Sequence, residues 1–145
     1  MYEASNEGVK IDLIIRGICC LIPGVAGLSE NIKVRSIVGR FLEHSRIFYF
    51  FNDGNEEMYM GSADMMQRNL DGRVETLFPI ENEKIRNEVM KTVIKASLKD
   101  NQKARTLLTD MTYIMTAPTN GSKPINSQEW LMKQVEKNHG LAIKP

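Results

Sequence analysis

The chain has 145 residues, close to the most common size of one domain and enough to bury a hydrophobic core. Hydrophobic residues make up 42% of it, charged residues make up 26%, and the formal net charge is +1. This composition is typical of a soluble globular protein, and the near-neutral charge argues against nucleic acid or an anionic membrane surface as a general partner. No apolar run approaches the roughly 20 residues that span a bilayer. The only two cysteines, Cys19 and Cys20, are adjacent, which favours a reduced, cytoplasmic setting.

The first part of the chain predicts a short helix followed by strands. Gly8 is typical of the residue that closes a helix, so residues 1–8 look like a last helical turn and the chain looks like part of something longer. The β-branched run at 11–15 predicts a buried strand. A loop rich in proline and glycine then leads to residues 32–42, which favour a strand, with a helix as the alternative.

The clearest β signal is a hairpin in the middle of the chain. Residues 47–51 and 58–60 are rich in aromatic and β-branched or long apolar side chains, and a turn that contains Gly54 joins them. Residues 73–79 predict a further strand that ends at its proline.

The remaining elements alternate between helix and strand. Asn82 is suited to cap a helix that runs to about residue 100 with one apolar stripe. Residues 103–117 predict two short strands, and residues 118–124 predict a solvated loop. A capping-box pattern at Asn126 predicts a last helix through Lys137. The order of elements predicts an α/β domain with a mixed sheet.

The side chains that could take part in catalysis or ligand binding lie on the hairpin and just after it. His44 and Arg46 are two positions apart at the start of its first strand, so their side chains point to one face. The second strand ends in Gly61-Ser62, which brings a closely approachable backbone and a hydroxyl back toward His44. The next connection adds two more cations, Arg68 and Arg73.

A histidine among arginines and a serine hydroxyl suits phosphoryl transfer. The transferred group spreads negative charge over three equatorial oxygens, which fixed cations stabilise. Arginine matches phosphate oxygens with a planar fork, and histidine exchanges a proton near neutral pH. The residues therefore predict a phosphate-binding cleft around His44.

The same residues resemble a half-site of the phospholipase D superfamily. His44-x-Arg46, the hairpin and Gly61-Ser62 are similar to its His-x-Lys … Asp … Gly-Ser-x-x-Asn pattern. The family's lysine, aspartate and asparagine are replaced by Arg46, Phe51 and Met65 respectively. These departures argue against an ordinary phospholipase D.

The chain resembles more closely the polyphosphate kinases that use a phosphohistidine, whose catalytic core has a phospholipase D-like fold. The matching segments are 13–19, 23 with 27–32, 36–46 and 62–75, and the order of elements is kept beyond about residue 80. The resemblance identifies residues 1–145 as a single domain, the C-terminal catalytic domain and second phospholipase D-like half, with a mixed sheet flanked by helices.

This resemblance implies reversible transfer of the ATP γ-phosphate to polyphosphate, with ATP or ADP and Mg²⁺ bound by the complete enzyme. Two similar domains each supply a histidine to a shared tunnel; the upstream histidine is phosphorylated, and His44 assists as general acid to the leaving nucleotide or chain end. Arg16 and Arg73 match arginines that hold the phosphates. Further candidate phosphate contacts are Arg46, Arg68 and Ser62.

Several other expectations follow from the resemblance. The chain supplies no metal ligands and half of an active site, so it is expected to be inactive alone. Its partners are polyphosphate, ATP or ADP and the remaining domains of the same enzyme, which forms a homo-oligomer and binds no nucleic acid. The expected location is cytoplasmic, with peripheral association with the inner membrane as an alternative.

Simpler interpretations remain open for individual residues. Ion pairs with nearby carboxylates would also explain Arg16, Arg46 and Arg68; the candidate partners are Glu43, Asp64, Asp71 and Glu75. Arg35 and Arg40 are expected to be solvated or structural, and His139 is given no role. The alternative functions are a phospholipase D-like phosphodiesterase and a non-catalytic polyanion-binding domain. The main hypothesis requires His44 and Arg16 to open onto one anion-sized pocket.

Overall fold

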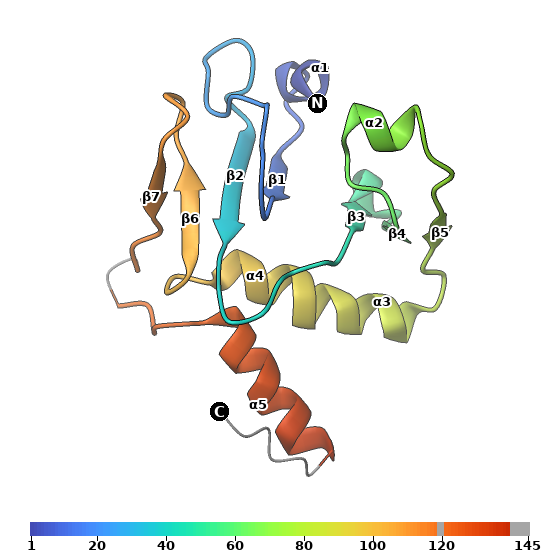
Figure 1. Ribbon diagram of the computed structural model, residues 1–145, viewed down its shortest axis with the longest axis vertical. Coiled ribbons are helices and arrows are strands. Elements are labelled where there is room, and N and C mark those ends of the chain that lie inside the picture. The colour runs from blue at the N-terminus through green and yellow to red at the C-terminus, as the bar shows by residue number, and fades with distance from the viewer. Residues whose placement is uncertain (119–120, 140–145) are drawn as a thin grey trace. The chain divides into compact units, whose positions relative to one another are not determined.

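The computed structural model describes residues 1–118 and 121–139. The chain divides into two compact units, one made of residues 1–42 and 93–145 and the other of residues 43–92. Each unit has its own sheet (Figure 1). The predicted loop at 118–124 lies partly outside the described residues.

The first unit contains the mixed sheet that the sequence predicts. Its four strands lie in the order β1-β2-β6-β7, with β1 and β2 parallel and the other neighbours antiparallel. Their bounds are β1 (Ile11–Ile14), β2 (Ile32–Ile37), β6 (Ala104–Leu107) and β7 (Tyr113–Met115). Residues 32–42 thus form a strand rather than a helix, but the strand ends at Ile37.

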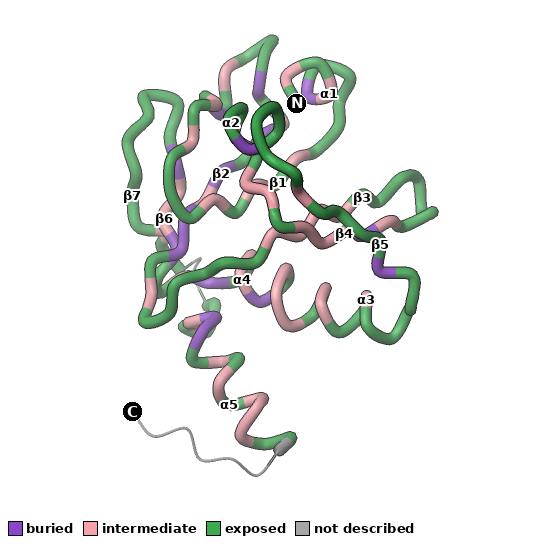
Figure 2. The backbone as a smooth tube through the Cα atoms, turned by 45° about the vertical axis from the view of Figure 1, so that its right-hand side comes forward, coloured by how far each residue is buried: buried purple, intermediate pink, exposed green. Residues whose placement is uncertain are grey.

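The core of this unit lies on β2 and β6. Ile32, Val34 and Leu107 are buried, and partly buried apolar side chains pack around them. Figure 2 shows the buried stretches concentrated on β2, β6 and the start of the last helix. β1 differs from the prediction of a buried strand, because its residues alternate between half-buried and exposed and Ile14 is 41% exposed.

Short helices complete the first unit. α1 (Tyr2–Asn6) ends where the sequence predicts, with Gly8 at a φ of 85° and its amide donating to the Ser5 carbonyl oxygen. α4 (Ala96–Lys99) precedes β6, and α5 (Ser127–His139) is the last helix. The predicted capping pair is confirmed, since the Glu129 amide donates to Asn126 Oδ1 at 3.3 Å.

One buried carboxylate joins the start of β6 to the start of α5. Asp100 is 1% exposed, and its Oδ2 accepts from the amide and the hydroxyl of Ser127, both at 2.8 Å. Its Oδ1 accepts from three successive amides: Gln102 at 3.0 Å, Lys103 at 2.7 Å and Ala104 at 3.1 Å. Two distant chain segments are therefore held by one side chain.

A second polar contact holds the segment that follows β2. The side-chain amide of Gln128 donates to the Phe41 carbonyl oxygen at 2.9 Å, and its oxygen accepts from the Phe41 amide at 3.0 Å. A Cβ at Gly39 would lie 2.3 Å from Gln128 Oε1, so the close approach requires glycine there. We call this arrangement the Gln128 clamp.

The second unit is built on the predicted hairpin. β3 (Ile47–Phe50) pairs antiparallel with β4 (Glu57–Gly61), which also pairs with β5 (Leu77–Pro79). The short 3-10 helix η1 (Asn52–Gly54) forms the hairpin turn, and α2 (Gln67–Leu70) lies between β4 and β5. β5 is shorter than the predicted strand at 73–79. Before Leu77, the Ser62 amide donates to the Thr76 carbonyl oxygen, but the Thr76 amide donates to Ser62 Oγ instead of a backbone carbonyl.

The long predicted helix exists but is not uniform. The Asn82 side chain accepts from the amides of Lys84 and Ile85, as its predicted role as N-cap requires. α3 (Glu83–Val89) is followed by a π-helical stretch, η2 (Met90–Lys95), and then by α4. The apolar spacing of four residues does not distinguish this widened turn from an ordinary α-helix.

Candidate functional site

His44 lies on a backbone segment that the second unit anchors. The residue is exposed, and its carbonyl oxygen accepts from Arg46 Nη1 at 3.1 Å. Arg46 Nε also pairs with Asp64 Oδ1 at 3.0 Å, and the Gly61 amide donates to the Arg46 carbonyl oxygen at 3.1 Å. Arg46 therefore ties the segment before β3 to the segment after β4.

This geometry matches the ion pair that the sequence left open for Arg46. Its side chain is 17% exposed and that of Asp64 is 43% exposed, so the pair is only partly screened by water. With Nε on a carboxylate and Nη1 on a carbonyl, the fork of Arg46 is largely used within the protein. Direct phosphate binding by Arg46 stays a prediction.

The Ser62 hydroxyl and Arg73 meet on one carboxylate. Ser62 Oγ donates to Glu75 Oε2 at 2.5 Å and accepts from the Thr76 amide at 3.0 Å. Arg73 Nε lies 3.4 Å from Glu75 Oε1. Because the Ser62 hydroxyl already donates to Glu75, it would have to rotate before it could donate to an oxyanion.

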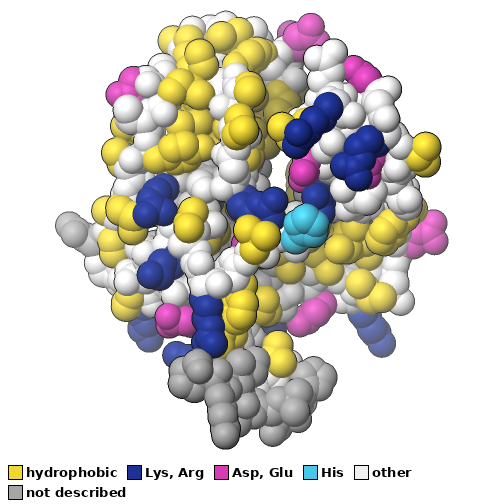
Figure 3. Space-filling view, viewed as in Figure 1, with side chains coloured by type: hydrophobic (Ala, Val, Ile, Leu, Met, Phe, Trp, Pro, Cys, Tyr) yellow, Lys and Arg dark blue, Asp and Glu magenta, His cyan; other side chains and the backbone are white. Residues whose placement is uncertain are grey.

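Arg73 nevertheless keeps most of its guanidinium in contact with solvent. Its side chain is 65% exposed, whereas that of Glu75 is 13% exposed. The contact therefore fixes the Nε side of Arg73 and leaves the other side of the fork accessible to an anion. Arg68, in α2, is also exposed, and its Nη2 donates to Met66 Sδ at 3.7 Å. Figure 3 shows Lys and Arg side chains gathered over α2 and its flanking loops.

Gly61 has a packing role in addition to the close approach to a ligand that the sequence suggests. A Cβ there would lie 2.9 Å from the Thr76 carbonyl oxygen and 3.1 Å from Leu77 Cδ1. The glycine thus permits the close approach of β4 and the segment before β5. This tight packing at the end of β4 accounts for the glycine without a ligand.

Arg16 belongs to the first unit and follows the end of β1. The Ile15 amide donates to the Arg35 carbonyl oxygen at 2.8 Å, and Ser36 Oγ donates to the Arg16 carbonyl oxygen at 3.3 Å. The Arg16 side chain is exposed. The carboxyl ends of parallel strands are where open α/β sheets bind ligands, so this position suits a phosphate contact. A common pocket for Arg16 and His44 stays a prediction.

The structure also describes Arg35, the two cysteines and the distribution of side chains that can bind metals. Arg35 is structural, because its Nη1 donates to the Leu98 carbonyl oxygen at the end of α4. Both cysteines are free thiols. In residues 1–118 and 121–139, no group of three or more His, Cys, Asp or Glu side chains could hold a metal ion.

No helix in the described part of the chain combines the length and the apolar character that crossing a bilayer requires.

Comparisons with known proteins agree with this fold. The family model for "Polyphosphate kinase C-terminal domain 2" matches residues 1–128. The polyphosphate kinase of Pseudomonas putida is 51% identical over 135 residues, which are 93% of this chain and 18% of that protein. Polyphosphate kinase 1 of Chlorobaculum tepidum is 51% identical over 149 residues and covers 99% of this chain, which corresponds to 20% of that protein.

A solved structure extends the comparison to three dimensions. The crystal structure of polyphosphate kinase from Porphyromonas gingivalis matches 94% of this chain and 21% of its own chain, with a TM-score of 0.88 and 39% sequence identity. The present chain therefore spans about a fifth of the length of the relatives it matches. With the family model covering residues 1–128 and the fold matched at this level, the chain belongs to the polyphosphate kinase family as its phospholipase D-like C-terminal domain 2.

Proposed function

We propose that this chain contributes to an ATP–polyphosphate phosphotransferase, which transfers the γ-phosphate of ATP reversibly to a polyphosphate chain. In the reaction, the bond between the γ-phosphorus and the ADP oxygen breaks, and a bond to a terminal polyphosphate oxygen forms. The phosphorylated histidine that carries the group between them lies in another domain of the complete enzyme. Mg²⁺ is held outside this chain, and the complete enzyme is a homo-oligomer.

Each candidate residue has a distinct task in this proposal. His44 donates a proton to the leaving oxygen of the nucleotide or the chain end, and takes one in the reverse direction. Arg16 and Arg73 bind phosphate oxygens and stabilise the charge that spreads over them in the transition state. Arg46 positions His44 through its contact with the His44 carbonyl oxygen.

The observation that carries the proposal is the arrangement within residues 43–92. An exposed imidazole lies on a backbone segment fixed by Arg46, and the same unit keeps the fork of Arg73 exposed. Phosphate transfer needs little covalent chemistry from a protein and depends mainly on positioned charge and a positioned proton. Membership in the polyphosphate kinase family supports the choice of ATP and polyphosphate as substrates.

Binding of polyphosphate by the chain tests the anion-binding part of this proposal. Arg16→Ala or Arg73→Ala is expected to weaken binding about 10-fold or more, because each change removes a charge-assisted contact to phosphate. His44→Ala is expected to bind nearly as well as the wild type, since His44 acts on a proton. Fluorescence anisotropy with labelled long-chain polyphosphate, at several salt concentrations, measures the affinity of the wild type and the three variants.

Two results would contradict the proposal. Equal affinities for the wild type, Arg16→Ala and Arg73→Ala would remove both arginines from the phosphate site. Sustained ATP-dependent chain synthesis by these 145 residues alone would contradict the assignment of half an active site to this chain.

A further inference from the structure

Three cations lie at one edge of the sheet in the first unit. β1 and β2 are parallel, so Arg16 after β1 and Arg40 after β2 follow carboxyl ends at the same edge. β6 is antiparallel to β2, and Ala104 at its start pairs with Ile37 at the end of β2. Lys103, immediately before β6, is therefore at this edge as well. The three cations therefore follow or precede neighbouring strand ends, which are about 4.8 Å apart within a sheet.

A cavity opens beside two of these cations. Its volume is about 320 Å³, within the usual range for ligand sites. Its lining comprises Arg40, Lys103, Asn126, Gln128, Glu129 and Met132. Two cations and one carboxylate give this lining a formal charge of +1, and one oxygen of that carboxylate already accepts from Asn126 Nδ2 at 2.9 Å. Within the described residues, neither Arg40 nor Lys103 forms an ion pair.

The backbone beneath both cations is held in place. Lys103 is fixed at its amide, which donates to the buried Asp100 carboxylate at 2.7 Å. Arg40 adjoins Phe41, whose amide and carbonyl are both bound by the Gln128 clamp, and its guanidinium lies 5.4 Å from the centre of the Phe41 ring. Gln128 is 6% exposed, so the cavity has a buried polar side chain in its lining. Because the backbone that carries both cations is already ordered, less conformational entropy is lost when an anion binds.

We propose that this cavity binds internal phosphates of a polyphosphate chain and that Arg40 and Lys103 contact the phosphate oxygens. The inference rests on the proposed function and extends it from the reacting end of the chain to phosphates farther along. It also gives a ligand to Arg40, which sequence reasoning expected to be solvated or structural. The Ser127 and Glu129 amides at the start of α5 are already engaged, because they donate to Asp100 and Asn126 respectively.

The chemistry of the lining favours a phosphate chain over a nucleotide. A planar guanidinium fork beside a compact ammonium suits successive phosphate groups that each carry negative charge. A nucleotide base is typically held by stacking on an aromatic side chain, and none is found among the lining residues in the described part of the chain. ATP therefore serves as the comparison ligand that separates the two sources of phosphate.

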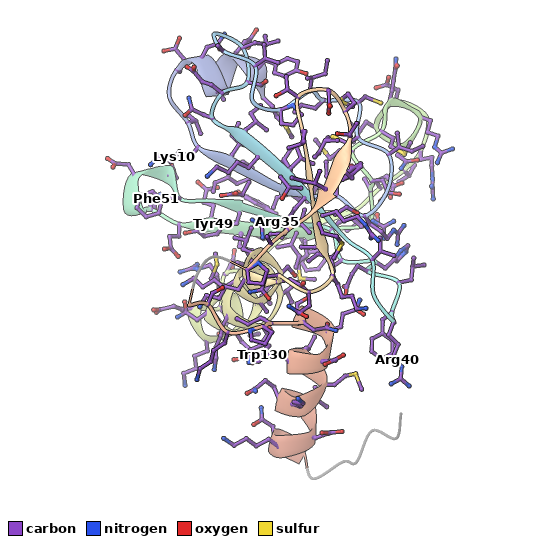
Figure 4. All side chains as sticks on the ribbon, turned by 90° about the vertical axis from the view of Figure 1, so that its left-hand side faces the viewer. Lys10, Arg35, Arg40, Tyr49, Phe51 and Trp130 are labelled. Carbon is purple, nitrogen blue, oxygen red and sulfur yellow. The ribbon has the colours of Figure 1, made fainter. Side chains whose placement is uncertain are left out.

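Titrations with long-chain polyphosphate and with ATP test this site. Arg40→Gln and Lys103→Gln are each expected to lower the affinity for polyphosphate about 3- to 10-fold, to reduce its salt dependence and to leave ATP binding unchanged. Lys10→Gln is the matched control, because it removes the same charge just before β1, at the other edge of this sheet. Figure 4 shows Lys10 and Arg40 far apart on this unit. The NMR signals of the Met132 methyl group and the Gln128 side-chain amide should shift on addition of polyphosphate.

The outcomes separate this inference from the proposed function. If Arg40→Gln and Lys103→Gln bind polyphosphate as Lys10→Gln does, or if the Met132 signal does not move, the inference is overturned. The proposed function still stands in that case, provided that Arg16→Ala weakens binding. A wild-type chain with no affinity for polyphosphate would contradict both. Equal losses of ATP and polyphosphate affinity would assign the cavity to nucleotide phosphates instead and would also overturn the inference.

Discussion

Replacing Asp100 with alanine is expected to lower the free energy of unfolding by about 3–5 kcal/mol, a large fraction of the stability of a small protein. The change leaves four amides and a hydroxyl without their acceptor, and several of these groups are buried. It also disconnects the start of β6 from the start of α5. Urea unfolding followed by the fluorescence of Trp130, the single tryptophan, measures the loss.

Two further variants test whether the loss of stability is specific to the buried Asp100 or follows from replacing any aspartate in a turn. Asp110→Ala is the matched control, since Asp110 accepts from the amide and hydroxyl of Thr112 in an exposed turn. We expect a much smaller loss there, because water replaces the missing acceptor. Asp100→Asn should fall between the two, as it keeps an oxygen for one set of donors. Equal stabilities of Asp100→Ala and Asp110→Ala would contradict the buried role of Asp100.

The same carboxylate should make stability depend on acid pH. Burial by itself would raise the pKa of Asp100, but hydrogen bonds from Ser127, Lys103 and Gln102 outweigh it and hold the pKa below the ordinary value of 3.8. A depressed folded-state pKa gives stability that is present above the unfolded value and is lost as the pH falls through the folded value. Between about pH 5 and pH 2, the wild type should therefore lose more stability than Asp100→Asn does. Urea titrations of both proteins at each pH measure this difference. If the carboxylate made no contribution, the free energy of unfolding would fall by the same amount in both proteins as the pH is lowered.

Local patterns predicted those elements whose causes are local. The hairpin at β3 and β4 follows from two apolar runs and a turn, and the Asn82 cap acts on amides two and three residues away. The mixed sheet follows from the alternation of strands and helices. The residue pattern on the hairpin and just after it also predicted His44 and its neighbouring arginines as a candidate site, whereas the family resemblance supplied Arg16 and the phospholipase D-like fold.

Contacts between distant segments could not be predicted in the same way. The Asp64 partner of Arg46 is 18 residues away and was one of several acids that the sequence left open. The Asp100–Ser127 contact joins residues 27 positions apart, and the Gln128 clamp spans 87. No short pattern marks such pairs, because each depends on the tertiary fold. Asp100 carries only a local signal, the Asx turn with Gln102.

In a complete polyphosphate kinase that carries this domain, His44→Ala is expected to lower kcat by about 100- to 10,000-fold, the usual range for a positioned acid or base. The KM for polyphosphate should change little, because the arginines rather than His44 provide most of the binding. Added imidazole should restore part of the rate, since it can occupy the space of the missing side chain and exchange the same proton. Steady-state kinetics in both directions of the reaction measure these effects.

His139→Ala is the matched control, because it removes the only other histidine in the chain. The pH dependence of kcat distinguishes proton transfer from a structural role for His44. His44→Gln keeps a polar side chain of similar size, so a folding defect in His44→Ala should be relieved while the loss of kcat remains. If His44→Gln has wild-type kcat, or if both histidine substitutions reduce kcat equally, His44 is not the proton donor, and its exposed imidazole has a role in binding or assembly instead.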